Sequence, residues 1–159
     1  MEFIFNPDLA PYFQLTLATL LGMLLGIERL LIGKTAGPRT YALVSMGSCL
    51  LTVISLTAAN YYPVLSKADP VSIVASVITG IGFIGAGLII FKGSKLSGLT
   101  TAAGIWVAAA IGIVVGFSHY LLALFATFLT LFVFTLMWNF ENKIKKMVDK
   151  QPHHHNHEE

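Results

Sequence analysis

Apolar runs of membrane-spanning length dominate this 159-residue sequence. A transmembrane helix needs about 20 consecutive, mostly apolar residues. The chain contains such runs in series, separated by short polar segments, and only 11% of its residues are charged, compared with about 25% in an average soluble domain. The pattern predicts an all-α integral membrane protein with five transmembrane helices. The expected spans are residues 12–32, 40–59, 71–91, 99–115 and 119–138.

The positions of lysine and arginine predict the orientation of these spans, because basic flanks stay in the cytoplasm. With five spans, only Lys67 falls on the opposite side from all other lysines and arginines. We therefore expect the N-terminus outside and the C-terminus in the cytoplasm. The residues on the cytoplasmic side would be Arg29, Lys34, Arg39, Lys92, Lys95, Lys143, Lys145, Lys146 and Lys150.

The chain is expected to divide into a transmembrane domain, residues 1–138, and a cytoplasmic tail, residues 139–159. The tail is basic at first and then rich in histidine. The histidine tract at residues 153–157 is of a composition that binds metal, but its uneven spacing defines no site. We therefore predict no metal site and no cofactor.

Four glycines fall between residues 80 and 87, in the sequence GIGFIGAG. Glycine inside a helix costs about 1 kcal/mol relative to alanine. In lipid, small residues let two helices approach closely. A helical projection places Gly80 and Gly87 on one face and Gly82 and Gly85 nearly opposite. We expect the third span to pack closely on both faces, at the bundle centre or between the bundle and a second copy of the chain.

The glycine cluster allows two other interpretations. The stretch matches the dinucleotide fingerprint GxGxxG, but that fingerprint requires a preceding strand and a soluble helix, so it is rejected here. A broken helix of the transporter kind, whose freed backbone groups line an ion site, is the open alternative to close packing.

The first and fourth spans also carry small residues at helical spacing. In the fourth span they recur every four positions from Gly104 to Gly116, which would let another backbone approach. The first span contains Gly22 and Gly26, and Arg29 continues the face of Gly22, so its charge is expected at or beside a helix contact. The fifth span is crowded with leucine and phenylalanine and is expected to face lipid.

Glu28 and Arg29 are the charges expected within a span, and such charges are functional candidates. The alternative is that both side chains reach along the helix to the membrane interface. Thr100 and Thr101, at the start of the fourth span, would either cap that helix or serve as ligands of a small site. Asp69 is expected to cap the third span rather than bind an ion.

Three sequence blocks resemble, in order and spacing, the MgtC/SapB membrane family. They are GIERLLIGKTAGPRTYALVSMGS, DPVSIVASVITGIGFIGAGLI and SGLTTAAGIWVAAAIGIVVG, and the resemblance covers residues 15–136. Carried over by position, the family's motif residues are Glu28, Arg29, Gly37, Arg39, Thr40, Asp69, Gly80, Gly82, Gly85, Gly87, Gly98, Thr100, Thr101 and Trp106.

The chain also departs from the family pattern. Family members usually carry further charges where this chain has residues 30–32, a leucine at Pro38, and a basic residue at Ser72 or Ser97. We therefore do not expect this chain to make the electrostatic contacts that those charged residues would make on the cytoplasmic side. The chain resembles a short form without the soluble C-terminal domain of the longer members, so regulation through that domain is not carried over.

The resemblance implies an inner-membrane protein tied to magnesium limitation, acid stress and survival inside host cells. It implies action on other membrane proteins, such as the ATP synthase, rather than carriage of magnesium. We expect a non-enzymatic modulator that works through helix contacts, as a homo-oligomer in the lipid bilayer, with no nucleic-acid partner. The alternative is a small ion or solute transporter with Glu28, Asp69, Thr100 and Thr101 near its path.

Overall fold

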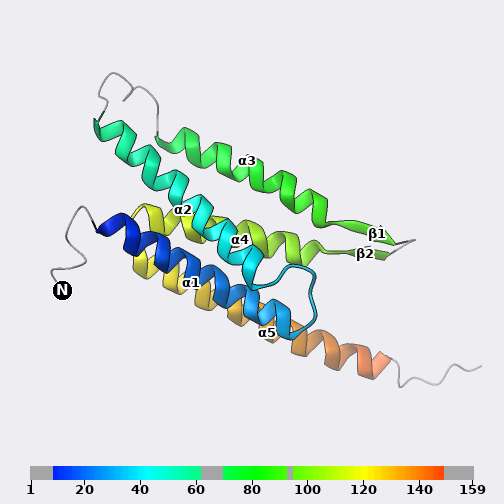
Figure 1. Ribbon diagram of the computed structural model, residues 1–159. Coiled ribbons are helices and arrows are strands. Elements are labelled where there is room, and N and C mark those ends of the chain that lie inside the picture. The colour runs from blue at the N-terminus through cyan, green and yellow to red at the C-terminus, as the bar shows by residue number, and fades with distance from the viewer. Residues whose placement is uncertain (1–8, 62–69, 93–94, 149–159) are drawn as a thin grey trace, which may run out of the picture.

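A computed structural model describes residues 9–61, 70–92 and 95–148. Over these residues the fold is a bundle of helices that run side by side, with one small β-hairpin (Figure 1). The hairpin pairs two antiparallel strands, with Ile90 opposite Ser97 and Phe91 opposite Leu96. The elements are α1 (Ala10–Leu31), α2 (Pro38–Tyr61), α3 (Pro70–Leu88), β1 (Ile90–Lys92), β2 (Lys95–Ser97), α4 (Leu99–Gly116) and α5 (Tyr120–Val148).

The described residues contain four helices, α1, α2, α4 and α5, that are long and apolar enough to cross a membrane. The described apolar part of α3 is shorter, Ser72–Leu88. The expected third span was too long at its end, since the chain leaves the helix after Leu88 and enters β1. Apolarity alone does not separate helix from strand, and the β-branched and aromatic residues of β1 favour extended structure.

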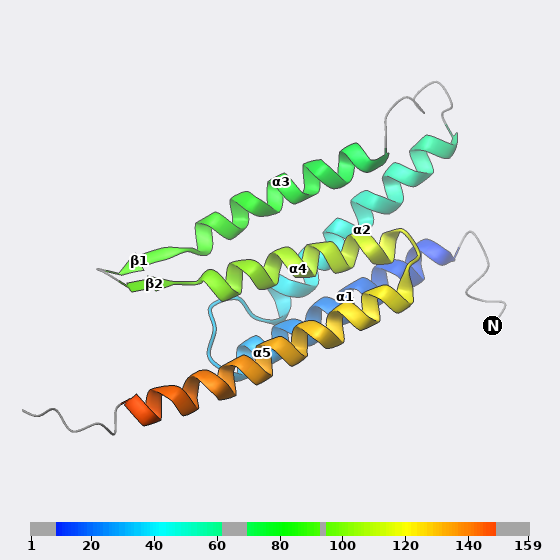
Figure 2. The same ribbon diagram turned by 180° about the vertical axis from the view of Figure 1, so that it is seen from behind.

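Helix α4 occupies the centre of the bundle, between α3 on one side and α1 and α5 on the other (Figure 2). In α4, 61% of the apolar span is buried, compared with 17% in α5. The alanines and glycines of α4 are the reason, because small side chains let neighbouring helices approach from several directions. Helix α5 is exposed along most of its bulky residues, as expected, although Phe134 is buried.

The prediction that the third span packs closely on two faces was wrong within this chain. A Cβ placed on Gly80, Gly82 or Gly87 would meet no atom of the described residues within 4 Å. Gly85 has only ordinary contact with α4. The side chains of α3 that reach the core are the bulky Val77 and Ile81, not the glycines. The helix is also continuous, so the broken-helix interpretation is contradicted.

The closest helix contacts lie on either side of α2. Tyr41 and Ser45, one turn apart on α2, are both completely buried. A Cβ on Gly22 of α1 would lie 2.5 Å from the Tyr41 carbonyl oxygen and 2.8 Å from Ser45 Cβ. On the other side, a Cβ on Gly112 of α4 would collide with the Ser45 carbonyl group. Glycine is therefore required on both neighbours, and the expected close approach of the first and fourth spans is confirmed.

The buried face of α2 is polar. Its hydroxyl-bearing side chains recur at alternating spacings of four and three residues, so they form one stripe along the helix. Thr52 Oγ1 donates a hydrogen bond to the Ser48 carbonyl (2.8 Å), whereas Ser45 Oγ finds no partner among the described residues. The stripe consists of Tyr41, Ser45, Ser48, Thr52 and Ser55.

The two ends of the bundle differ in what they carry. At one end, Gln14 of α1 donates hydrogen bonds from Nε2 to the Gly116 carbonyl (3.3 Å) and to Ser118 Oγ (2.9 Å), which ties α1 to the turn between α4 and α5. At the other end lie the end of α1, the start of α2, the hairpin and the far end of α5 (Figures 1 and 2).

The glycine contacts generate a stability prediction. Gly112→Ala places a methyl group against the α2 backbone, so we expect a loss of about 1–3 kcal/mol in the free energy of unfolding. The matched change Gly82→Ala adds a methyl group in open space and improves helix propensity, so we expect stability to be unchanged or raised by up to about 1 kcal/mol. Steric trapping of the monomer in bicelles measures both. Equal stability of the two variants would contradict the assignment of α4 to the centre.

Candidate functional site

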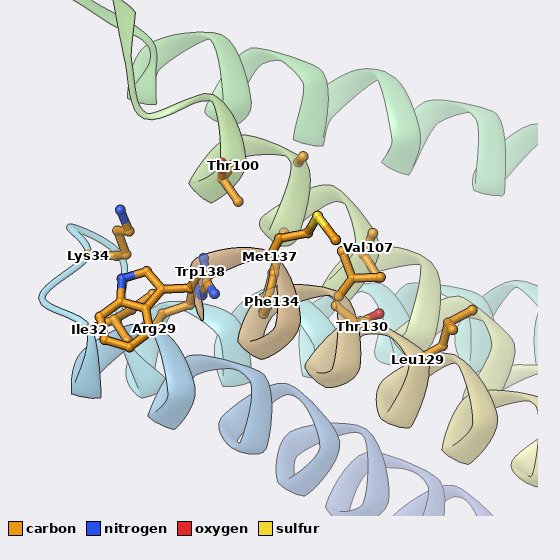
Figure 3. A pocket seen from close by; sticks show the side chains of 13 residues that line it. Arg29, Ile32, Lys34, Thr100, Val107, Leu129, Thr130, Phe134, Met137 and Trp138 are labelled. Carbon is orange, nitrogen blue, oxygen red and sulfur yellow. The ribbon is translucent and has the colours of Figure 1, made fainter. Parts of the chain in front are cut away.

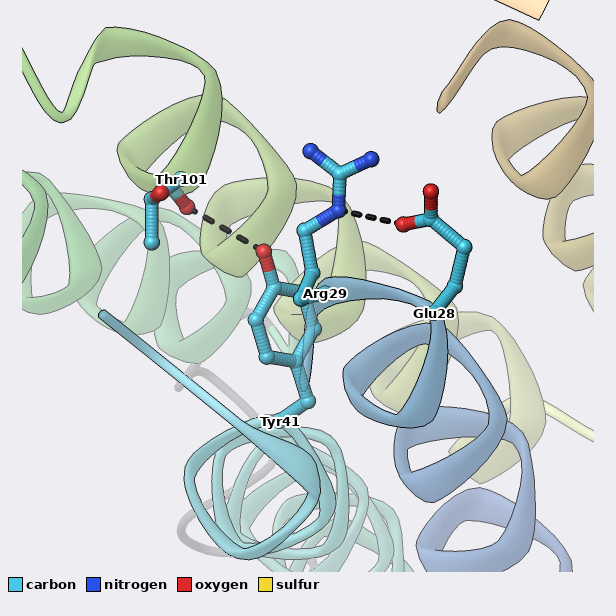
Figure 4. Close-up of polar contacts among 4 residues, drawn as sticks. All are labelled: Glu28, Arg29, Tyr41 and Thr101. Carbon is cyan, nitrogen blue, oxygen red and sulfur yellow. Dashed lines mark hydrogen bonds and ion pairs between the residues drawn. The ribbon is translucent and has the colours of Figure 1, made fainter. Parts of the chain in front are cut away.

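A buried ion pair lies on the last turn of α1. The Arg29 side chain is only 2% exposed, and its Nε donates to the Glu28 carboxylate, which is 15% exposed (Figure 4). The Arg29 guanidinium carbon also lies 3.5 Å from the ring centroid of Phe134 on α5. A cation over an aromatic ring contributes about 0.5–2 kcal/mol, more when it is shielded from water. Arg29 is thus enclosed by protein and does not extend along an exposed surface, and the expected position of its charge at a helix contact is confirmed.

Gly104 of α4 makes this arrangement possible. A Cβ at this position would collide with the Tyr41 hydroxyl and lie 2.7 Å from the Phe134 ring. The Tyr41 hydroxyl donates a long hydrogen bond of 3.4 Å to the Thr101 carbonyl (Figure 4). Side chains from α2 and α5 thus meet over the same glycine, next to the guanidinium of Arg29.

The turn after α1 fixes the position of a second cation. Gly33 has φ +69°, a left-handed conformation that L side chains rarely adopt, and its N–H donates to the Leu30 carbonyl (3.0 Å). The N–H of Lys34 then donates to the Arg29 carbonyl (2.9 Å). These two bonds form a Schellman C-cap. The backbone therefore holds Lys34 beside the turn that carries Arg29.

A pocket of about 440 Å³ opens beside these residues (Figure 3). Its polar lining includes Arg29, Lys34 and Thr100 at one end, and the Trp138 indole also lines it. Most of the remaining lining comes from apolar side chains of α4 and α5. A second pocket of about 590 Å³ lies between α2 and α3, and Gly80 and Ser76 are among its lining residues.

The structure brings together some of the predicted site residues. Glu28 pairs with Arg29, and the carbonyl of Thr101 accepts from the Tyr41 hydroxyl that lies at Gly104. Thr100 is exposed to the pocket that Arg29 lines. The expected capping role of the two threonines is contradicted. The N-cap of α4 is Gly98, with φ +92° and no side-chain cap bond, so both threonines lie inside the first turn.

Other predicted residues lie apart from this cluster. Arg39 and Thr40 are exposed on the first turn of α2, and Trp106 is 46% exposed on α4. None of these three lines the pocket beside Arg29. Asp69 falls outside the described residues, as do the tail histidines. The four glycines of the cluster, Gly80, Gly82, Gly85 and Gly87, are on α3.

Sequence reasoning missed three residues that organise the site and the bundle. Tyr41 and Phe134 enclose Arg29 and Gly104, and Gln14 joins α1 to the far turn. Gln14 is a lone amide in an apolar span, and polar residues inside spans are candidates for buried contacts. Tyr41 heads the four-three spacing of hydroxyl residues on α2. Phe134 has no comparable signal, because α5 is rich in phenylalanine throughout.

In the part of the chain that the structure describes, no group of three or more histidine, cysteine, aspartate or glutamate side chains could hold a metal ion. The polar centre is instead a cation enclosed by an aromatic ring, a carboxylate and a tyrosine. This arrangement can hold helices in register and present a positive charge to the pocket.

Comparison with known proteins matches residues 15–143 to the model of the MgtC family. YhiD of Escherichia coli K12, whose name describes a proposed magnesium transporter, is 44% identical over 124 residues, covering 76% of this chain and 57% of that protein. SapB of Bacillus subtilis is 40% identical over 123 residues (76% and 52%). MgtC of Salmonella typhimurium LT2 is 40% identical over 122 residues (76% and 50%).

The chain spans about half the length of these curated relatives. No solved structure gives a significant match. The family match covers four apolar helices of membrane-spanning length and the buried ion pair, which supports the resemblance seen in the three sequence blocks. This membrane protein therefore belongs to the MgtC family.

Proposed function

We propose that this chain is a non-enzymatic modulator of other membrane proteins that works through helix contacts in the bilayer. The observation that carries the proposal is the uncovered face of α3. Gly80 and Gly87 lie on one face of that helix, and a Cβ at either would meet no atom of the described chain within 4 Å. In lipid, small residues gain little from exposure but allow a second helix to approach closely. The occupant would be a second copy of the chain or a partner helix such as one from the ATP synthase.

The physiological setting is proposed from the relatives. One relative's name describes magnesium transport, and that description concerns YhiD itself. Membership of the same family supports a role for this chain in magnesium or acid-stress homeostasis, including conditions met inside host cells. The chain matches about half of each relative, so this role rests on the shared membrane region.

We further propose that α3 is a fifth span, with the N-terminus outside and the C-terminus in the cytoplasm of an inner membrane. Support comes from the common end at which α1 ends, α2 begins, and α5 carries the exposed Lys143. Arg29 and Lys34 lie at the same end, on the last turn of α1 and just after it. Basic residues gathered at one end of a bundle favour the cytoplasmic side for that end.

A transporter is the second candidate, because Arg29 lines an open pocket and is paired with the partly buried Glu28. Ionisable groups inside membrane proteins often mark ion pathways. In this alternative Glu28 would bind or release the transported ion or a proton, with Thr100 on the pocket wall. Asp69 would have to lie near the same path.

The proposed topology predicts a labelling pattern. We expect a membrane-impermeant maleimide, added to intact spheroplasts, to label His119→Cys but neither Thr35→Cys, between α1 and α2, nor Leu96→Cys until the membrane is permeabilised. All three positions are exposed in the structure. Each cysteine is placed in a Cys49→Ala background. Labelling of Thr35→Cys and Leu96→Cys from opposite sides would contradict the five-span arrangement, because α2 and α3 must both cross between these two positions.

The modulator proposal predicts what happens when large side chains replace the glycines on the uncovered face of α3. Gly80→Leu combined with Gly87→Leu should leave the fold intact, because both positions are open, but should lower partner capture and growth under magnesium limitation or acid at least about tenfold. The matched control is Thr135→Leu, an exposed position on α5. Oligomer mass, crosslinking to partners and growth are measured together.

Two outcomes would contradict the modulator. One is normal oligomer mass, partner capture and stress growth in the double variant. The other is a protein-dependent magnesium or proton flux in proteoliposomes that Glu28→Gln abolishes and the double glycine variant leaves unchanged. That second result would favour the transporter.

A further inference from the structure

The pocket beside Arg29 has a polar end and an apolar body. Arg29, Lys34 and Thr100 supply two cations and a hydroxyl at the polar end (Figure 3). The walls that lead away from this end include Val107 of α4 and Leu129 of α5. A ligand that fills the pocket must therefore carry a polar, anion-type group and a long apolar part.

The length of the pocket indicates how long that apolar part is. Val107 lies seven residues after Thr100 on α4, and Leu129 lies nine residues before Trp138 on α5. At a rise of about 1.5 Å per residue these separations correspond to about 11–14 Å along the helices. One leaflet of the hydrocarbon core is about 15 Å thick. The pocket is therefore long enough to hold an acyl chain that extends through most of one leaflet.

The polar end lies where a lipid headgroup would be expected. Lys34 follows the end of α1, and Thr100 is in the first turn of α4, so both lie at the ends of helices. Trp138 lines the same pocket, and tryptophan is enriched at membrane interfaces.

The net charge at the polar end of the pocket would be neutralised by one anion. Glu28 pairs with Arg29 through Nε, and in the described chain no hydrogen bond reaches the two terminal nitrogens of that guanidinium (Figure 4). Arg29, Lys34 and Glu28 together sum to one positive charge. Guanidinium groups bind phosphate oxygens through paired N–H donors, and charge-assisted bonds of this kind are about twice as strong as neutral ones.

We infer that this pocket binds one anionic phospholipid, with the phosphate group between Arg29, Lys34 and Thr100 and an acyl chain between α4 and α5. A phospholipid with one net negative charge neutralises the site, whereas a zwitterionic lipid does not. The lipid would fill the space between the end of α1, α4 and α5. The inference goes beyond the proposed function and does not depend on it, since a modulator and a transporter could each carry the lipid.

Native mass spectrometry of the full chain in detergent tests the inference. The protein is titrated with phosphatidylglycerol and, separately, with phosphatidylcholine of the same acyl chains. We expect phosphatidylglycerol to bind about fivefold more tightly, which corresponds to one extra charge contact near a membrane surface. Inorganic phosphate at the same concentrations should neither bind measurably nor displace the lipid.

Matched variants separate the two ends of the pocket. Lys34→Gln should weaken phosphatidylglycerol binding about fivefold. It should weaken phosphatidylcholine binding less, because the choline cation offsets the charge of the same phosphate. Arg39→Gln, which removes an exposed cation outside the pocket, should change neither. Ala103→Leu fills the apolar wall and should weaken both lipids at least fivefold. Ala75→Leu, at an exposed position on α3, should weaken neither.

Three results would overturn the inference. Equal losses in Lys34→Gln and Arg39→Gln would show general attraction to a basic surface. Unchanged lipid binding in both Lys34→Gln and Ala103→Leu would show that lipid binds elsewhere. Displacement by inorganic phosphate, with Ala103→Leu behaving as wild type, would assign the pocket to a free anion.

Discussion

The contact of α2 with its two neighbours is the interaction on which the rest of the structure depends. In a bilayer, burying apolar side chains does little to hold helices together, because lipid tails are equally apolar, and close van der Waals packing has to do so instead. Gly22 of α1 and Gly112 of α4 provide that packing, since both lie against the backbone of α2 at Tyr41 and Ser45. Among the described helices these three are the most closely packed, and α3 and α5 lie on their outside.

The buried charge is a consequence of this arrangement. With α2 held against α1 and α4, the Tyr41 hydroxyl and the Phe134 ring meet over Gly104, and Arg29 stacks on that ring. A lone cation inside a membrane protein is costly, so the Glu28 carboxylate and the ring are needed to stabilise it. Arg29 also lines the pocket, and within the described chain its hydrogen bond to Glu28 uses only Nε, so the site that fixes the helices also has the chemistry to receive a ligand.

Much of the fold could be predicted from the sequence, because apolar length and small-residue spacing are local properties. The sequence predicts the extents of α1, α2 and α4 and the close approach of Gly22 and Gly112. It also predicts the exposed leucines and phenylalanines of α5. Which glycine-rich helix is central was not, since Gly82 and Gly112 look alike in sequence and differ only in what lies opposite. Only part of the site around Arg29 could be predicted from the sequence. Arg29 was an evident candidate because it is charged, but Phe134, far along the chain and one phenylalanine among many, meets it only through tertiary packing.

Magic-angle-spinning NMR of the uniformly ¹³C-labelled protein in lipid bilayers tests the central contact most directly. The structure predicts ¹³C–¹³C correlations from Gly112 Cα to the Ser45 backbone and from Gly104 Cα to the Tyr41 ring, because a Cβ on either glycine would touch those groups. It predicts no correlation from Gly82 Cα to α1 or α2. Absence of the Gly112–Ser45 and Gly104–Tyr41 signals, together with correlations from Gly82 to α2, would show that α3 and not α4 is the centre of the bundle.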